Sequence, residues 1–293
     1  MFQELLNIYI PLLIGITLGF IVKPSDEQLV LLAKIVLYIF LPALLFSATY
    51  ARLLQSSDPT VLTISLLSGL SVVLTFMLTK ALREKEEIIL TSMYANAGYL
   101  PLGIAQSLYG ESGAASVGFY ILGNNSTSNF IAPSLSRKSQ EKPSRTLKRI
   151  MSFPPIVAIV LGSILGLVGI KIPDFILSSL KPFAESASSL ALVELGIEFS
   201  LNPSLSLDGI KAYLYRILVV VPLTFLFISS GLLKGVDKGV ALIESVMPSA
   251  VSCMPISREL GLDSNKVSRI IFTSTLIATM VVLPIVLFFF NVP

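Results

Sequence analysis

The sequence contains no histidine and no tryptophan, and Cys253 is its only cysteine. Without histidine the common ligand sets for zinc are missing, so we expect neither a metal site nor a cofactor. A single cysteine cannot form an intrachain disulfide, and this one lies within an apolar stretch. Chemistry based on a metal or a thiol is therefore not indicated.

Charged side chains are also scarce. They make up 13% of the 293 residues, against about 25% in an ordinary soluble protein, and 54% of the residues are hydrophobic. This composition excludes a soluble domain and predicts a chain surrounded by membrane lipid. The net charge of +3 does not indicate a nucleic-acid partner, because the basic residues lie between apolar stretches.

Ten apolar segments cover most of the chain, and each approaches the roughly 20 residues that a membrane-crossing helix needs. They lie near residues 5–22, 29–50, 59–80, 87–109, 114–136, 151–170, 183–200, 212–233, 239–260 and 267–290. We therefore expect an all-α integral membrane protein with ten transmembrane helices. The first segment follows Gln3 and Glu4 and not a basic stretch, which favours a retained helix over a cleaved signal peptide.

A basic stretch at residues 137–149 sets the expected orientation in the plasma membrane. Cytoplasmic loops are enriched in Lys and Arg, so we expect this stretch inside the cell and both termini outside. The other basic residues then expected inside are Lys23, Lys34, Lys80, Arg83, Lys85, Lys211, Arg216, Arg258, Lys266 and Arg269. Those left outside are Arg52, Lys171, Lys181, Lys234 and Lys238.

The same stretch divides the chain into a five-helix block at residues 1–136, a cytoplasmic loop at 137–150, and a second five-helix block at 151–293. Because each block holds an odd number of crossings, the two blocks have opposite orientations, as in the inverted repeats of many transporters. Two residue pairs match at one offset of 151 residues: Gly110 with Gly261, and Pro133 with Pro284.

The fourth segment of each block is interrupted by proline and small polar residues. The segment at 87–109 contains Asn96, Gly98 and Pro101, and the segment at 239–260 contains Ser249 and Ser252 between Pro248 and Pro255. Proline removes a backbone donor, and such breaks survive in a membrane only inside protein or beside a watery cavity. The single prolines Pro11, Pro42, Pro222 and Pro284 are expected only to kink their helices.

The paired breaks indicate a substrate site near the middle of the membrane. Pro101 and Pro255 suit the first turn of a second half-helix, so two helix N-termini would face the membrane centre. Each carries about half a positive charge and free N–H donors, which favours a carboxylate or a similar anion. The candidate substrate-binding residues are Tyr94, Asn96, Pro101, Asn125, Ser249, Ser252 and Pro255.

Three further groups of polar residues lie within or beside the apolar segments. The run GNNSTSN at 123–129 cannot face lipid, and it serves either the site, through Asn124 and Asn125, or an interhelical hydrogen-bond network. Glu194 and Glu198 share one helix face; Glu194 is a candidate for ion coupling or an interhelix bond, and Glu198 suits a solvated helix end. Glu244 is expected at the outer membrane interface.

Four stretches in order resemble the auxin efflux carrier family, which includes plant PIN-formed exporters and bacterial and archaeal permeases. They are IVLYIFLPALLF from Ile35, the stretch Asn96 to Gly110, LALVELGIEFSL from Leu190, and MPSAVSCMPISRELGLD from Met247 followed by STLIATMVVLP to Pro284. The resemblance implies a bile-acid-symporter-like fold of two inverted repeats whose fourth and ninth helices cross at their breaks. It also implies a scaffold of helices 1, 2, 6 and 7, often dimeric, and a moving unit of helices 3, 4, 5, 8, 9 and 10.

In the same resemblance Asn96 occupies the position of the family's substrate-binding asparagine. One departure affects the expected specificity: the family's proline seven residues after that asparagine is Gly103 here, and the nearest proline is Pro101.

The first hypothesis for function is alternating-access transport, of elevator type, of a small organic anion such as an auxin-like or dicarboxylic acid. The alternative is a sodium-coupled carrier similar to bile-acid symporters, in which Glu194 and carbonyls of the ninth helix would hold cations. A channel stays open as a reading, and an enzyme is not expected because the sequence shows no facing pair of catalytic acids at mid-depth.

Overall fold

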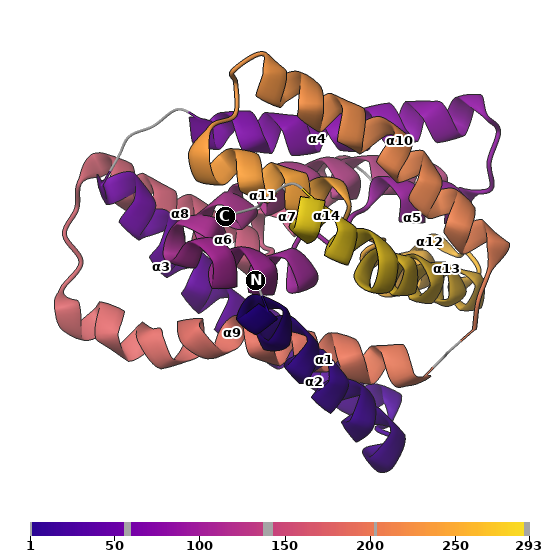
Figure 1. Cartoon of the computed structure of the whole chain (residues 1–293), viewed down its shortest axis with the longest axis horizontal. Helices are drawn as coiled ribbons and strands as arrows, with labels where there is room; N and C mark the ends of the chain where they lie inside the picture. Colours follow the sequence, from indigo (N-terminus) through magenta and orange to yellow (C-terminus); the bar gives the residue numbers. More distant parts are fainter. Residues whose placement is uncertain (1, 56–59, 137–142, 202–203, 290–293) are drawn as a thin grey trace.

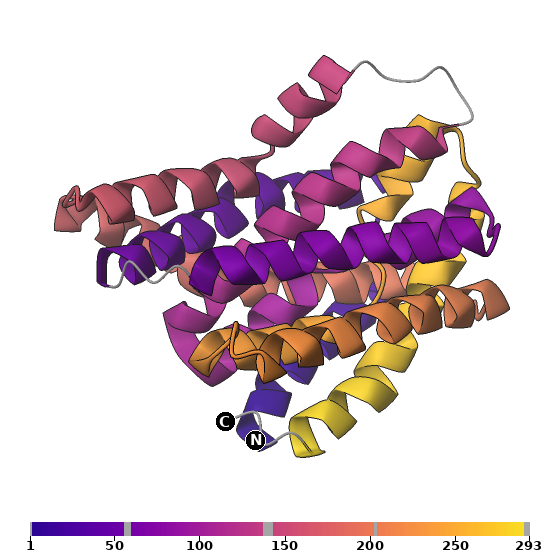
Figure 2. The same cartoon turned by 90° about the horizontal axis from the view of Figure 1, so that it is seen from above.

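The computed structural model describes residues 2–55, 60–136, 143–201 and 204–289, and within them the chain is almost wholly helical. The first block contains α1 (Phe2–Val22), α2 (Asp26–Ile35), α3 (Leu41–Gln55), α4 (Thr60–Ala81), α5 (Glu86–Met93) and α6 (Tyr99–Ile131). The second contains α7 (Pro143–Met151), α8 (Pro154–Val168), α9 (Asp174–Leu201), α10 (Leu207–Ser229), α11 (Gly235–Ser245), α12 (Cys253–Leu260), α13 (Ser264–Ile277) and α14 (Leu283–Phe289). Helices α4 and α10, the third segments of the two blocks, run side by side in Figure 1 and Figure 2.

Helical structure coincides with every apolar segment expected from the sequence, with two differences. Helix α6 runs from the second half of the fourth segment through the fifth, with a sharp turn at Gly110, whose φ is 60° and ψ −143°. Glycine permits this left-handed backbone without a Cβ clash. The expected basic loop is helical over Pro143–Met151, and its residues 137–142 lie outside the described residues.

Four stretches of the described chain are long and apolar enough to cross a membrane by themselves: Glu27–Gln55, Val61–Ala81, Leu207–Ser229 and Ser264–Val286. The shorter apolar helices are Tyr9–Val22 and Pro154–Val168. Ten crossings in two inverted repeats stay a prediction.

Two of these stretches continue through a proline. A π-helical turn at Val36–Phe40 joins α2 to α3 just before Pro42, and another at Ala278–Val282 joins α13 to α14 just before Pro284. Proline has no N–H to donate to the preceding turn, and the wider turn absorbs this defect while the helix continues. Neither proline interrupts its helix, and the kinks stay a prediction.

Small residues bring α1 and α9 into close contact. A Cβ atom on Gly15 would lie 2.1 Å from the Val193 carbonyl oxygen, and one on Gly196 would lie 2.3 Å from that of Leu12. One turn further along, Gly19 faces Ser200. Between membrane helices there is no hydrophobic drive to associate, so such close backbone approach supplies the packing.

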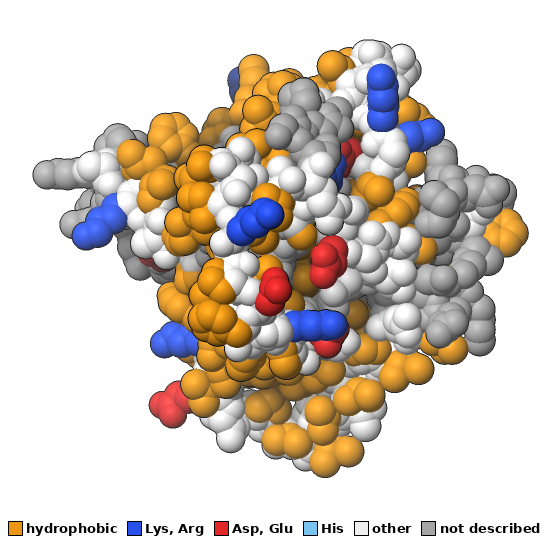
Figure 3. Space-filling model, turned by 90° about the vertical axis from the view of Figure 1, so that its left-hand side faces the viewer, with side chains coloured by type: hydrophobic (Ala, Val, Ile, Leu, Met, Phe, Trp, Pro, Cys, Tyr) orange, Lys and Arg blue, Asp and Glu red, His pale blue; other side chains and the backbone are white. Residues whose placement is uncertain are grey.

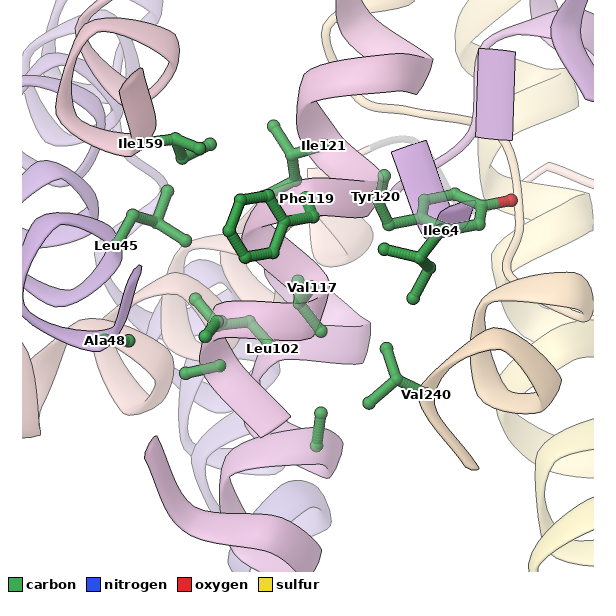
Figure 4. Close-up of a cluster of buried hydrophobic side chains, with 14 of the residues drawn as sticks. Leu45, Ala48, Ile64, Leu102, Val117, Phe119, Tyr120, Ile121, Ile159 and Val240 are labelled. Carbon is green, nitrogen blue, oxygen red and sulfur yellow. The ribbon is translucent and has the colours of Figure 1, made fainter. Parts of the chain in front are cut away.

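The core lies around α6, and the exterior is apolar. Figure 4 shows Leu45 and Ala48 from α3, Ile64 from α4, Ile159 from α8 and Val240 from α11 converging on a stretch of α6. Large hydrophobic side chains such as Ile21, Phe175 and Leu218 are exposed, and Figure 3 shows hydrophobic side chains over much of one face, with a group of charged side chains near its middle. An exterior of this kind requires an apolar environment, which the lipid of a membrane provides.

A buried ion pair connects α3 with α11 and α6. Both terminal nitrogens of Arg52 donate to Asp237, at 2.9 Å to Oδ1 and 2.6 Å to Oδ2, and the Ser116 hydroxyl donates to Oδ1 at 2.6 Å. The Asp237 side chain is 2% exposed and that of Arg52 15%. This geometry joins an element of the expected scaffold to two elements of the expected moving unit.

Arg52→Ala should lower the free energy of unfolding by about 3 kcal/mol, because it leaves the Asp237 carboxylate buried without its ion-pair partner. Lys181→Ala is the matched control: its pair with Glu185, at 3.7 Å, is exposed on both sides and contributes less than about 1 kcal/mol. Thermal unfolding of the purified variants in detergent measures both changes. Equal losses of stability would contradict the structural role assigned to Arg52.

Candidate functional site

The two interrupted helices cross at their breaks. The first break separates α5 from α6 at residues 94–98, and the second separates α11 from α12 at residues 246–252. The breaks run antiparallel: the Asn96 N–H donates to the Pro248 carbonyl at 2.8 Å, and the Ala250 N–H donates to the Tyr94 carbonyl at 2.9 Å. Each break thus satisfies backbone groups of the other in a region with little water.

Both half-helices that leave the crossing carry proline at the same place. Pro101 is the third residue of α6, and Pro255 is the third residue of α12. First-turn N–H groups have no carbonyl partner within the helix, so proline removes no bond there. The expected first-turn positions of these prolines are confirmed.

The N–H donors at these helix starts are less free than expected. The Tyr99 N–H donates to Asn96 Oδ1 at 3.2 Å, and those of Cys253 and Met254 donate to the carbonyls of Ala250 and Val251. The free donor at the crossing is instead the Asn96 side-chain amide, whose Nδ2 is buried and has no hydrogen-bond partner in the described structure. An anion at this point would meet the Asn96 amide and the positive ends of two helix dipoles.

A cavity of ≈ 410 Å³ lies against the crossing. Its walls come from α2 and the turn that follows it, both breaks, α6, the start of α8, α9 and α12. The apolar lining includes Leu29, Val30, Leu37, Leu41, Ile121, Phe153, Val251, Met254 and Ile256. The charged lining residues among the described side chains are Glu194, Glu198 and Arg258.

Six of the eight site residues expected from the sequence line this cavity: Tyr94, Asn96, Asn125, Glu194, Ser252 and Pro255. The structure does not bring Pro101 or Ser249 into the lining. Ser249 is 1% exposed, and its N–H donates to Ser274 Oγ at 3.3 Å, on another side of the crossing.

The polar run at 123–129 contributes to the cavity, whereas no hydrogen bond is formed by the Asn124 side chain in the described structure. Asn125 lines the cavity together with Asn129, which was not singled out from the sequence although it lies one turn further along the same helix face. Asn129 Nδ2 donates to the Tyr94 hydroxyl at 3.1 Å and so holds it at the cavity wall. Asn124 is fully buried and does not line the cavity.

The acid pair on α9 faces the same cavity. Glu194 is 3% exposed; the Tyr99 hydroxyl donates to its Oε1 at 3.5 Å, and its Oε2 has no partner in the described structure. Glu198 is half-buried, not a solvated helix end as expected, and it also lines the cavity. No cluster of three metal-ligating side chains occurs among the described residues.

Two charged residues lie deeper than expected. Glu244 was expected at the outer interface, but it is fully buried where α11 approaches the second break. Arg216 was counted among the basic residues on the inner side, but it is 1% exposed and contacts that break. Hydropathy alone missed both, because a charge within a long apolar run gives no signal of how far it reaches into the protein.

The apolar exterior, the long apolar helices and a central cavity beside two broken helices define a multi-pass membrane protein of the transporter class. Comparison with known proteins agrees: the sequence profile of the family described as membrane transport protein matches residues 123–286. The chain belongs to this family, which comprises permeases of the auxin efflux carrier type.

Two archaeal relatives match over most of their length. A protein of Methanocaldococcus jannaschii named an uncharacterized transporter is 30% identical over 278 residues, which cover 88% of this chain and 89% of that relative. A protein of the same description from Methanothermobacter thermautotrophicus is 26% identical over 299 residues, covering 97% of this chain and 96% of the relative.

Cysteine labelling tests which side of the crossing lines the cavity. In a Cys253→Ser background, Ser252→Cys should react with a small thiol reagent, because Ser252 is exposed in the cavity, whereas Ser249→Cys should stay unmodified. The mass shift of the intact protein in mild detergent measures the reaction. Labelling of both positions at similar rates would contradict the described placement of the second break.

Proposed function

We propose that this membrane transporter is a permease for a small organic anion, with the substrate bound at the crossing of the two broken helices. The observation that carries the proposal is the Asn96 side chain. Its Oδ1 accepts the first N–H of α6, its Nδ2 is buried without a partner, and the residue lines the cavity beside the starts of α6 and α12. An amide donor and two helix N-termini form a site for a carboxylate.

Three charged residues of the cavity wall would orient the substrate. Glu194 and Glu198 would repel a carboxylate, so the acid group of the substrate would be placed by the Asn96 amide or by Arg258. The remainder of the cavity is largely apolar, with Leu37, Ile121 and Met254 among its walls. A carboxylate with an apolar or aromatic body suits such a lining.

The transport cycle that we propose is alternating access of elevator type. The cavity is lined by Phe153 and Arg258, which adjoin the parts of the chain expected in the cytoplasm, so this conformation would be inward-facing. Helices α1, α2, α3, α8 and α9 would form the scaffold. Because Arg52 on α3 binds Asp237 on α11, this ion pair would have to open when the moving unit shifts.

The proposal keeps the remaining expectations from the sequence. The protein would lie in the plasma membrane with both termini outside and residues 137–150 in the cytoplasm, and two copies would pair through their scaffold helices.

Asn96→Asp is the sharpest test of the substrate site. The aspartate keeps an oxygen at the start of α6, but it removes the Nδ2 donor and adds a negative charge, so uptake into liposomes should fall at least tenfold. Because Asn96 is 3% exposed, the new charge should also lower the melting temperature, and uptake is compared at a temperature where the variant is folded. Asn96→Ala should also lose uptake, with about 1 kcal/mol of stability lost with the cap. The exposed Asn7→Ala serves as control and should transport normally. Undiminished uptake by Asn96→Asp would remove Asn96 from the site.

We further propose that Glu194 couples transport to an ion gradient, since its Oε2 lies buried without a partner beside the cavity. Wild-type uptake should be stimulated by an imposed proton gradient, and Glu194→Gln should lose that stimulation while still exchanging substrate. Glu185→Gln, an exposed position on the same helix, is the control. Stimulation that survives in Glu194→Gln would contradict the assignment.

A sodium-coupled carrier is the alternative, and the same unpartnered oxygen of Glu194 is what favours it. Replacing external sodium by choline separates the two readings. Uptake that depends on sodium, and loses this dependence in Glu194→Gln, would support the alternative.

A further inference from the structure

Arg216 reaches from α10 into the end of α11 at the second break. Its Nε donates to the Met247 carbonyl at 2.9 Å, and its Nη2 lies 3.4 Å from both the Glu244 carbonyl and the Tyr120 hydroxyl. It is 1% exposed and does not line the cavity, so its charge is enclosed by protein and not offered to the substrate.

Burying a guanidinium in a membrane protein is costly unless negative groups surround it. Here the negative group placed against the guanidinium is the C-terminal end of the α11 dipole, through the carbonyls of Glu244 and Met247. The Glu244 side chain is 0% exposed at the same helix end, and both of its carboxyl oxygens lack a hydrogen-bond partner in the described structure. Arg216 Nη1 is likewise buried without a partner.

The groups around the guanidinium form an oxygen-rich shell of two backbone carbonyls and a hydroxyl. Oxygen ligands of this type hold hard cations in proteins, and the C-terminal ends of broken transporter helices are places where coupling sodium ions bind. In this chain the centre of the shell is occupied by a side chain. The ninth-helix carbonyls that a sodium-coupled carrier would use are engaged by Arg216.

We propose that the Arg216 guanidinium is a built-in cation that takes the place of a bound coupling ion at the second break and makes assembly of the crossing independent of sodium. The consequence for transport rests on the proposed function, because it assumes that substrate binds at the crossing. Cation binding in this shell does not depend on the proposed function, because it is measured without substrate.

The experiment removes the Arg216 side chain and supplies a free cation in its place. Purified Arg216→Ala should melt below the wild type in choline chloride, and millimolar guanidinium or sodium should restore at least half of the loss at constant ionic strength. The wild type should show no difference between sodium and choline. Urea, as an uncharged analogue of guanidinium, should not rescue, and the exposed Arg269→Ala should respond like the wild type.

Glu244 provides the second arm. Adding Glu244→Gln to Arg216→Ala removes the ionisable carboxyl group buried at the same helix end, so the rescue by guanidinium and sodium should disappear. Arg216→Lys, which retains a positive charge, should melt close to the wild type and need no added cation.

Three results would overturn the proposal: a sodium-dependent melting temperature in the wild type, an Arg216→Ala variant that no cation stabilises more than urea does, or a rescue that persists after Glu244→Gln. If Arg216→Ala does not fold, the wild-type comparison of sodium with choline still decides. Failure of the substrate site would appear separately, as normal uptake by Asn96→Asp with the cation rescue of Arg216→Ala intact.

Discussion

Two backbone hydrogen bonds between the breaks hold the centre of this molecule together. Interrupting a helix inside a membrane leaves N–H and C=O groups that lipid cannot satisfy, at several kcal/mol each. The donation from Asn96 to Pro248 and from Ala250 to Tyr94 solves this for both breaks at once, because each supplies the partner that the other lacks. Neither break satisfies these groups alone, and so the two blocks depend on each other at the point where the cavity lies.

Side chains around the crossing satisfy the remaining backbone groups of the two breaks, and they do so differently on its two sides. On the cavity side Asn96 caps α6, and Asn129 fixes Tyr94, which leaves one amide free for a ligand. On the other side Arg216 closes the end of α11, where carbonyls and not N–H groups need partners. Helix polarity explains the division: an uncharged amide suffices beside the N-terminal ends, whereas the C-terminal end attracts a cation.

Much of this arrangement could be predicted from the sequence. Apolar runs located the helices, and the cluster of Asn96, Gly98 and Pro101 with its counterpart around Pro248 and Pro255 located the breaks, since proline and glycine act on the local backbone. The side on which a residue of a break lies could not be predicted: Ser252 lines the cavity and Ser249 does not, although they are three residues apart. Periodicity has no meaning in a non-helical stretch, and the depth of Arg216 and Glu244 likewise depends on contacts distant in the sequence.

The displaced proline is explained by packing against α9. A Cβ atom on Gly103 would lie 2.9 Å from Leu192 Cδ1, so position 103, where the resembling family carries proline, faces α9 at close range here. With proline at 101, in the first turn, α6 loses no backbone hydrogen bond and can approach α9 through glycine. The approach places the Tyr99 hydroxyl 3.5 Å from Glu194 Oε1. The shift by two residues therefore accompanies a close approach of the start of α6 to the acid pair on α9.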